Sequence, residues 1–131
     1  MKKIFKFSGL IGVLLLVLTG CGTANIYNVQ NNPVTIKSGT SSNAIYKAIQ
    51  KAGASKGWII TKKSEGVAKA KINLRTHQAI VEINYNNVGY SIKYVSSINL
   101  NSDGKVIHTN YNGWIQNLEK AINIQLSLLA D

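Results

Sequence analysis

Few side chains in this sequence carry the chemistry of catalysis. The acidic residues number only five, namely Glu65, Glu82, Asp103, Glu119 and Asp131. A glycosidase needs two carboxyl groups about 5–10 Å apart, one of them with a raised pKa, and the positions of these residues do not indicate such a pair. His77 and His108 stand far apart, without the close ligand spacing of a zinc site. We therefore expect a protein that is not an enzyme and that holds no metal ion or cofactor.

The one cysteine, Cys21, follows a short apolar segment. Lys2, Lys3 and Lys6 precede an apolar run from Leu10 to Leu18. A helix that crosses a membrane needs about 20 apolar residues, so this run is too short and is typical of the core of a signal peptide. A single cysteine also excludes an intramolecular disulfide and a cysteine-based zinc or iron–sulfur site.

The residues Leu18-Thr19-Gly20-Cys21 resemble the lipobox of bacterial lipoproteins. This resemblance, which covers the first 21 residues, implies that residues 1–20 are a signal peptide cleaved before Cys21. It also implies a diacylglyceryl group on the Cys21 thiol and an acylated α-amine, and two or three acyl chains form a stable membrane anchor. The alternative is an ordinary secretory signal followed by a chance cysteine. Since Gly22 rather than Asp follows the cysteine, the resemblance favours the outer membrane, facing the periplasm, in a Gram-negative source, and the cell membrane otherwise.

Residues 21–42 are rich in Asn, Ser, Thr and Gly and contain the only proline, Pro33. Such a composition favours a lipid anchor followed by a flexible tether, which over about 20 residues would reach roughly 25 Å. Residues 34–36 alternate and could add a short edge strand. A single folded domain is expected over residues 43–131.

Apolar residues recur at helical spacing over residues 43–52 and 111–129. Residues 41–43 offer N-caps for the first helix and Gly53 a stop, while residues 109–110 can begin the second helix. Between the helices, four alternating segments predict strands over residues 57–63, 66–74, 78–85 and 89–97. A small hairpin extension is expected around Asp103-Gly104, within residues 98–109.

Turn residues give the expected register of a four-stranded antiparallel meander. The turn at residues 86–89 pairs Tyr85 with Tyr90, a loop over residues 75–78 pairs Leu74 with Ala79, and a turn at residues 64–66 pairs Ile60 with Ala68. These registers collect apolar residues on one face, where both helices must bury their apolar stripes. The predicted fold is α+β, a two-layer sandwich in the order helix, four strands, helix, and this layout resembles small α+β lipoproteins of bacterial envelopes.

The opposite face of the predicted sheet is mostly polar, with Glu82 placed between Lys71 and Lys93 and with Ile80 beside Val95. The chain has 15 Lys+Arg against 5 Asp+Glu, a formal charge of +10, and loses three lysines with residues 1–20. The candidate interaction surface combines lysines, one acid and two apolar residues, namely Lys69, Lys71, Ile80, Glu82, Lys93 and Val95. Its expected partners are an envelope protein or an anionic envelope component; the alternative is a solvated basic face. Nucleic acid is not expected.

Six aromatic residues could line a ligand groove, but most fall on the predicted buried face, which favours core packing: Trp58, Tyr85, Tyr90, Tyr94, Tyr111 and Trp114. The pair at the hairpin tip, Tyr85 and Tyr90, is the expected exposed exception. The sequence thus predicts a membrane-anchored, non-enzymatic binding or accessory module. The alternative is a periplasmic carrier or sensor of a small apolar ligand, which would need an internal cavity of several hundred Å³.

Overall fold

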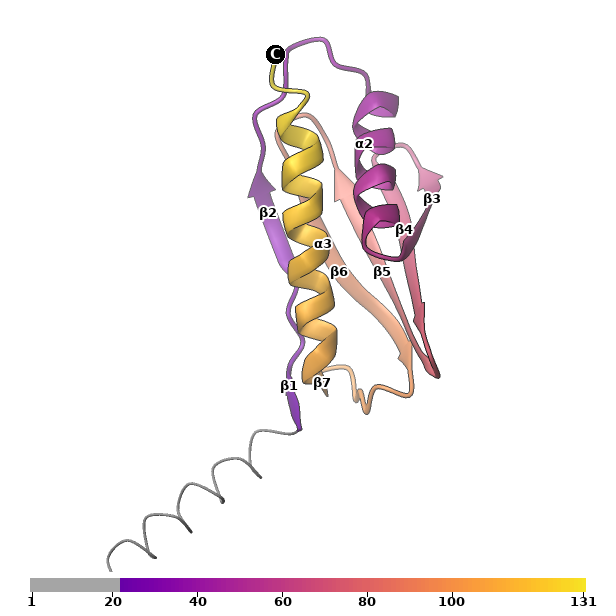
Figure 1. Cartoon of the computed structure of the whole chain (residues 1–131). Helices are drawn as coiled ribbons and strands as arrows, with labels where there is room; N and C mark the ends of the chain where they lie inside the picture. Colours follow the sequence, from indigo (N-terminus) through magenta and orange to yellow (C-terminus); the bar gives the residue numbers. More distant parts are fainter. Residues whose placement is uncertain (1–21) are drawn as a thin grey trace, which may run out of the picture.

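Two helices lie on one face of a five-stranded antiparallel sheet in the computed structural model, which describes residues 22–131 (Figure 1). The predicted signal peptide and Cys21 lie outside the described residues. In chain order the elements are β1 (Thr23–Asn25), β2 (Val29–Pro33), α2 (Ser42–Ser55), β3 (Trp58–Ser64), β4 (Val67–Leu74), β5 (His77–Tyr85), β6 (Gly89–Ile98), β7 (Val106–His108) and α3 (Thr109–Ser127).

The α+β class and the placement of two helices on a largely antiparallel sheet are confirmed, whereas the four-stranded meander was incomplete. Strands β3 to β6 form that meander, but β2 pairs with β6 and extends the sheet to the order β2-β6-β5-β4-β3. The predicted hairpin extension was also wrong, because β7 pairs with β1 in a separate two-stranded sheet.

The segment predicted as a flexible tether is folded into the domain over much of its length. Long-range hydrogen bonds explain this: the Asn112 side chain accepts from the Tyr27 amide at 3.0 Å and donates to the Asn25 carbonyl at 2.9 Å. The Tyr27 hydroxyl donates to Glu119 at 2.7 Å, and this hydrogen bond, with burial, raises the pKa of Tyr27. Val29 is buried in the core. The polar residues of this segment therefore belong to an edge strand and its flanks, which dock on α3.

The predicted register holds for one hairpin and shifts by two residues in the others. Tyr85 pairs with Tyr90 as expected. However, Leu74 pairs with His77 rather than Ala79, and Ile60 pairs with Ala70. Between β4 and β5 the reason is a two-residue turn at Arg75-Thr76, where Arg75 adopts a φ of 57° that favours Gly or Asn and so gave no sequence signal. Between β3 and β4 the turn is confined to residues 65–66, and the pairing is irregular between Lys62 and Ser64. A shift by two keeps every side chain on its predicted face.

Both helices match their predicted positions to within three residues at each end. The Ser41 hydroxyl caps α2 by accepting from the Ala44 amide at 3.1 Å. Gly53 does not end α2 but lies buried inside it, because a Cβ at this position would collide with the Ile60 side chain of β3. The cap of α3 is His108, whose Nδ1 accepts from the Asn110 amide at 3.2 Å.

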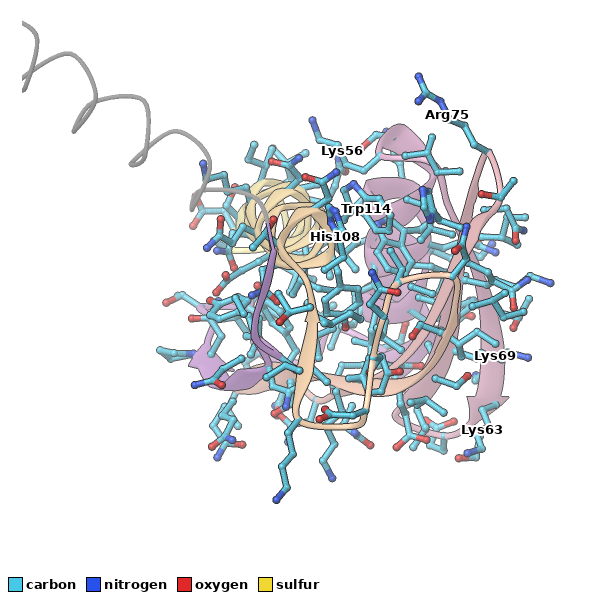
Figure 2. All side chains as sticks on the ribbon, turned by 90° about the horizontal axis from the view of Figure 1, so that it is seen from below. Lys56, Lys63, Lys69, Arg75, His108 and Trp114 are labelled. Atoms are coloured by element: carbon cyan, nitrogen blue, oxygen red, sulfur yellow. The ribbon has the colours of Figure 1, made fainter. Side chains whose placement is uncertain are left out.

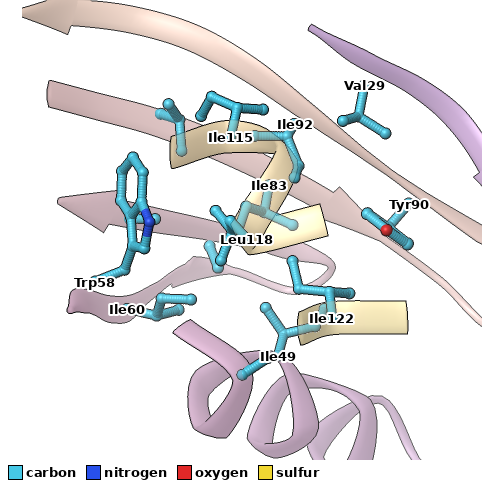
Figure 3. Packing of buried hydrophobic residues seen from close by; sticks show 14 of the residues in the cluster. Val29, Ile49, Trp58, Ile60, Ile83, Tyr90, Ile92, Ile115, Leu118 and Ile122 are labelled. Atoms are coloured by element: carbon cyan, nitrogen blue, oxygen red, sulfur yellow. The ribbon is translucent and has the colours of Figure 1, made fainter. Parts of the chain in front are cut away.

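The core fills the space between the sheet and the two helices. Figure 3 shows Ile83 and Ile92 of the sheet together with Ile115 and Leu118 of α3, all at most 1% exposed. Small residues on the inner face of the sheet leave room for the helices, namely Ala68, Ala70 and Ala79, each 0% exposed. Burial of this apolar set is the main stabilising contribution, at about 25 cal/mol per Å².

A matched pair of tyrosine substitutions tests the packing of this core. The Tyr90 hydroxyl donates to Asn123 at 2.7 Å and accepts from Asn32 at 2.9 Å, and burial raises its pKa to about 12. The Tyr111 hydroxyl is buried without a hydrogen-bond partner among the described residues. We expect Tyr90→Phe to lower the free energy of unfolding by about 1 kcal/mol and Tyr111→Phe to leave it unchanged or raise it. Urea unfolding of both variants measures this, and a larger loss for Tyr111→Phe would contradict the assignment.

Candidate docking surface

The face of the sheet opposite the helices is uncovered along the described residues. Strands β4, β5 and β6 bring together on it all six residues of the predicted interaction surface: Lys69, Lys71, Ile80, Glu82, Lys93 and Val95. Lys63 of β3 joins them, and Figure 2 shows Lys63 and Lys69 pointing away from the helices. We call these seven residues, together with Ile59 and Ile98, the open face.

Glu82 is the acidic residue among the lysines of the open face, but its neighbours differ from the prediction. The register places it opposite Lys69 and Lys93, so the expected pairing with Lys71 was wrong. The Lys63 ammonium lies 3.0 Å from the Glu82 carboxylate. The hydrogen bond from Lys63 is the main cause that lowers the pKa of Glu82, with smaller contributions from Asn84 and Lys93. Glu82 therefore stays ionised, and the surrounding lysines outnumber it.

Apolar side chains run across the same face. Ile59 is 59% exposed, Val95 54% and Ile98 58%. The cross-strand register places Lys71 between Ile59 and Ile80. Ile98 was missed because strict alternation along its strand would place it on the inner face, whereas the irregular pairing near Val95 places it opposite Gln78 on the outer face.

A β-bulge shapes a hollow in the open face. The pairing of β5 with β6 shifts between Ile80 and Val81, so that Ile80 lies opposite Ser96 and Val95 is the extra residue. The hollow has a volume of about 320 Å³, and its lining joins the apolar and charged groups of the face: Lys63, Lys69, Ile80, Val81, Glu82, Val95 and Ser96. This is a shallow apolar depression with a basic rim, suited to an apolar side chain that has acidic neighbours.

The aromatic residues contribute to the core and not to this face. Tyr85 is 6% and Tyr90 2% exposed, so the expectation that this pair would be exposed at the hairpin tip was wrong. The reason is that β2 and α3 cover the end of the hairpin, where Tyr90 bonds to Asn32 and Asn123. Tyr94 packs edge-on against Tyr111, with ring centroids 5.7 Å apart.

The two histidines, Glu119 and Asp103 have structural partners. Glu119 accepts from Tyr27, His108 caps α3, and the Nδ1 of His77 lies 2.6 Å from the Asn99 carbonyl. Asp103 accepts from the amides of its own turn, which lowers its pKa. Within residues 22–131 no group of three potential metal-ligating side chains occurs. In the same part of the chain no helix has the length and hydropathy needed to cross a membrane.

One further pattern, Gly53-Ala54-Ser55-Lys56-Gly57, matches the G-x-S-x-G spacing of hydrolase nucleophiles. That motif needs a sharp turn between a strand and a following helix. Here the serine lies at the end of α2, and its hydroxyl donates to the Ala52 carbonyl at 2.6 Å. The order of elements is reversed, so the pattern lacks the geometry of a nucleophile.

Comparisons of the chain with protein-family models, curated proteins and solved structures gave no significant match.

Proposed function

We propose that this protein is a lipid-anchored lipoprotein of the bacterial envelope that docks another envelope protein without catalysing a reaction. The anchor is the acylated Cys21, in the outer membrane facing the periplasm of a Gram-negative cell or in the cell membrane otherwise. This part of the proposal is supported by the order of charged, apolar and lipobox residues before position 22.

The single observation that carries the docking role is the open face. A two-layer fold normally leaves the outer face of its sheet polar, whereas here Ile59, Val95 and Ile98 are more than half exposed. Ile80, Val95 and Ile98 are neighbours on β5 and β6, and exposed apolar residues rimmed by polar ones are typical of interaction sites. The hollow of about 320 Å³ between Ile80 and Val95 offers a place for an anchoring side chain.

The charge of the open face indicates the chemistry of the partner. It carries four lysines, namely Lys63, Lys69, Lys71 and Lys93, against the single carboxylate of Glu82. Complementary charge speeds association and fixes orientation. We therefore assign the face to an acidic protein surface that also presents an apolar side chain.

The carrier alternative receives no support from the described residues. The hollows found along them open to the surface, and none is lined by Ile83, Ile115 or Leu118 at the centre of the core. These three side chains are each 0% exposed. A carrier would instead place its ligand within this layer.

Charge reversal tests the docking role. In chromatography of mild-detergent extracts of native membranes, the wild-type protein should elute in a complex with one protein species. The variant Lys69→Glu/Lys93→Glu should elute alone, because both substitutions reverse the charge beside Glu82. The control Lys47→Glu/Lys120→Glu makes the same charge change on exposed positions of the helices and should keep the complex.

Thermal unfolding of both double variants establishes that they are folded. Equal behaviour of the two variants, or elution of the wild type alone, would refute the open face as a docking site. A complex that contains an anionic lipid or polysaccharide in place of a protein would show that the assigned class of partner is wrong.

A further inference from the structure

The chain enters the described domain at one end of the sheet. The Gly22 carbonyl accepts a hydrogen bond from the Thr109 amide at 3.2 Å, and Thr23 pairs with His108, so both lie at the start of α3 (Figure 1). The Cα atoms of consecutive residues are about 3.8 Å apart. No tether therefore separates position 21 from this end of the domain.

Two loops lie at the same end. The Asn99 side chain donates to the Thr76 hydroxyl at 2.7 Å, which ties the end of β6 to the turn between β4 and β5. The His108 amide donates to the Leu100 carbonyl at 2.8 Å, which ties the loop after β6 to β7. We call this surface the proximal end and define it by residues 22–23, 74–77, 98–105 and 108–110.

The proximal end has the composition of a surface that meets phospholipid headgroups. Leu74 is 45% exposed, and Arg75 and Lys105 are exposed cations. Ile98, which is 58% exposed, lies at the border where the open face meets this end. Figure 2, which looks onto this end, shows Arg75 projecting at its margin. Asp103 is the one acidic residue in the ranges that define the proximal end, and its carboxylate is engaged by the amides of Lys105 and Val106. Basic groups near an anionic bilayer surface favour binding, and partly inserted apolar side chains add to it.

We propose that the proximal end rests on the anionic phospholipid headgroups of the membrane that holds Cys21, so that the domain stands upright with its open face turned sideways. This inference depends on the proposed lipidation of Cys21. The 19 residues of α3 span about 28 Å, so the turn at residues 86–88 is held well above the bilayer. A partner would then reach the open face along the membrane surface rather than from above it.

Fluorescence quenching in vesicles measures this orientation. The lipidated protein carries a small fluorophore at Leu74→Cys or at Asn87→Cys, two exposed positions at opposite ends. It is reconstituted in vesicles of phosphatidylethanolamine and phosphatidylglycerol that contain a headgroup-labelled quencher. Quenching is expected at position 74 and not at position 87. Equal quenching at the two positions in vesicle-bound protein would overturn the proposed orientation.

Two variants make the test specific. A flexible insertion of 20 Gly and Ser residues between Cys21 and Gly22, reaching roughly 25 Å, should abolish the quenching at position 74 while the protein still floats with the vesicles. Arg75→Glu/Lys105→Glu should weaken that quenching, and the control Lys47→Glu/Lys120→Glu should not. Unchanged quenching in the insertion variant would refute the absence of a tether, and unchanged quenching in Arg75→Glu/Lys105→Glu would refute the electrostatic contact. Failure of the wild type to float would instead refute lipidation, and with it the proposed function.

Discussion

Cys21→Ala should transfer the mature protein from the membrane fraction to the soluble fraction. Each buried acyl methylene contributes about 0.8 kcal/mol, so loss of all acyl chains removes the whole anchoring free energy. Fractionation of cells followed by immunoblotting measures the transfer, with the comparison restricted to chains from which residues 1–20 have been removed.

The matched control is Gly22→Ala. A Cβ at Gly22 meets no atom within 4 Å, so this neighbouring substitution should leave the protein folded and bound to the membrane. Retention of the processed Cys21→Ala chain in the membrane fraction would contradict lipidation. The mass of the wild-type chain gives an independent check, since a lipidated chain should begin at an acylated Cys21.

Leu118→Ala should destabilise the domain by about 3–4 kcal/mol. Leu118 is 0% exposed at the centre of α3, where it faces the inner side of the sheet. The substitution removes apolar contacts and leaves a cavity that neighbouring side chains refill only in part. Because domains of this size are stable by about 5–15 kcal/mol, the loss is a large fraction of the total.

Leu128→Ala is the control for this substitution, because it makes the same chemical change at a residue that is 69% exposed. It should change the free energy of unfolding by no more than about 0.5 kcal/mol. Urea unfolding of both variants in the Cys21→Ala background measures the two values. Similar small losses at both positions would mean that the space between sheet and helices is not closely packed, which the carrier alternative requires.

The two faces of the sheet could be predicted from the sequence, but its full extent could not. Alternation assigned the side chains of β3, β4, β5 and the first part of β6 to their faces, and the two-residue errors in register preserved that assignment. After the bulge at Val95 the faces of β6 are exchanged, which places Ile98 on the open face. The edge strand expected at residues 34–36 was misplaced, since β2 lies at Val29–Pro33, and β1 was missed. Their strand partners are β6 and β7, and the hydrogen bonds of Asn25 and Tyr27 reach α3, more than 80 residues away. The apolar pattern of Ile26, Tyr27 and Val29 was the signal that could have shown them.

The open face was predicted in composition and only partly in its contacts. All six predicted residues lie on it, because alternation along each strand predicts which face of the sheet a side chain occupies. The ion pair of Glu82 with Lys63 depends on the irregular pairing near Ser64, which turn composition does not indicate. The hollow beside Val95 likewise follows from a bulge between β5 and β6. Bulges and turn lengths are set by long-range packing, and a single sequence gives little information about them.

Site-specific photocrosslinking in living cells is the most direct test of the docking role. A benzophenone amino acid is placed at Val95 on the open face or at Ile124 on α3, positions that are 54% and 62% exposed. We expect an adduct with one envelope protein from position 95, none from position 124, and loss of the adduct when Lys69→Glu/Lys93→Glu is added. No protein adduct from position 95, or the same adduct from both positions, would contradict the docking role of the open face.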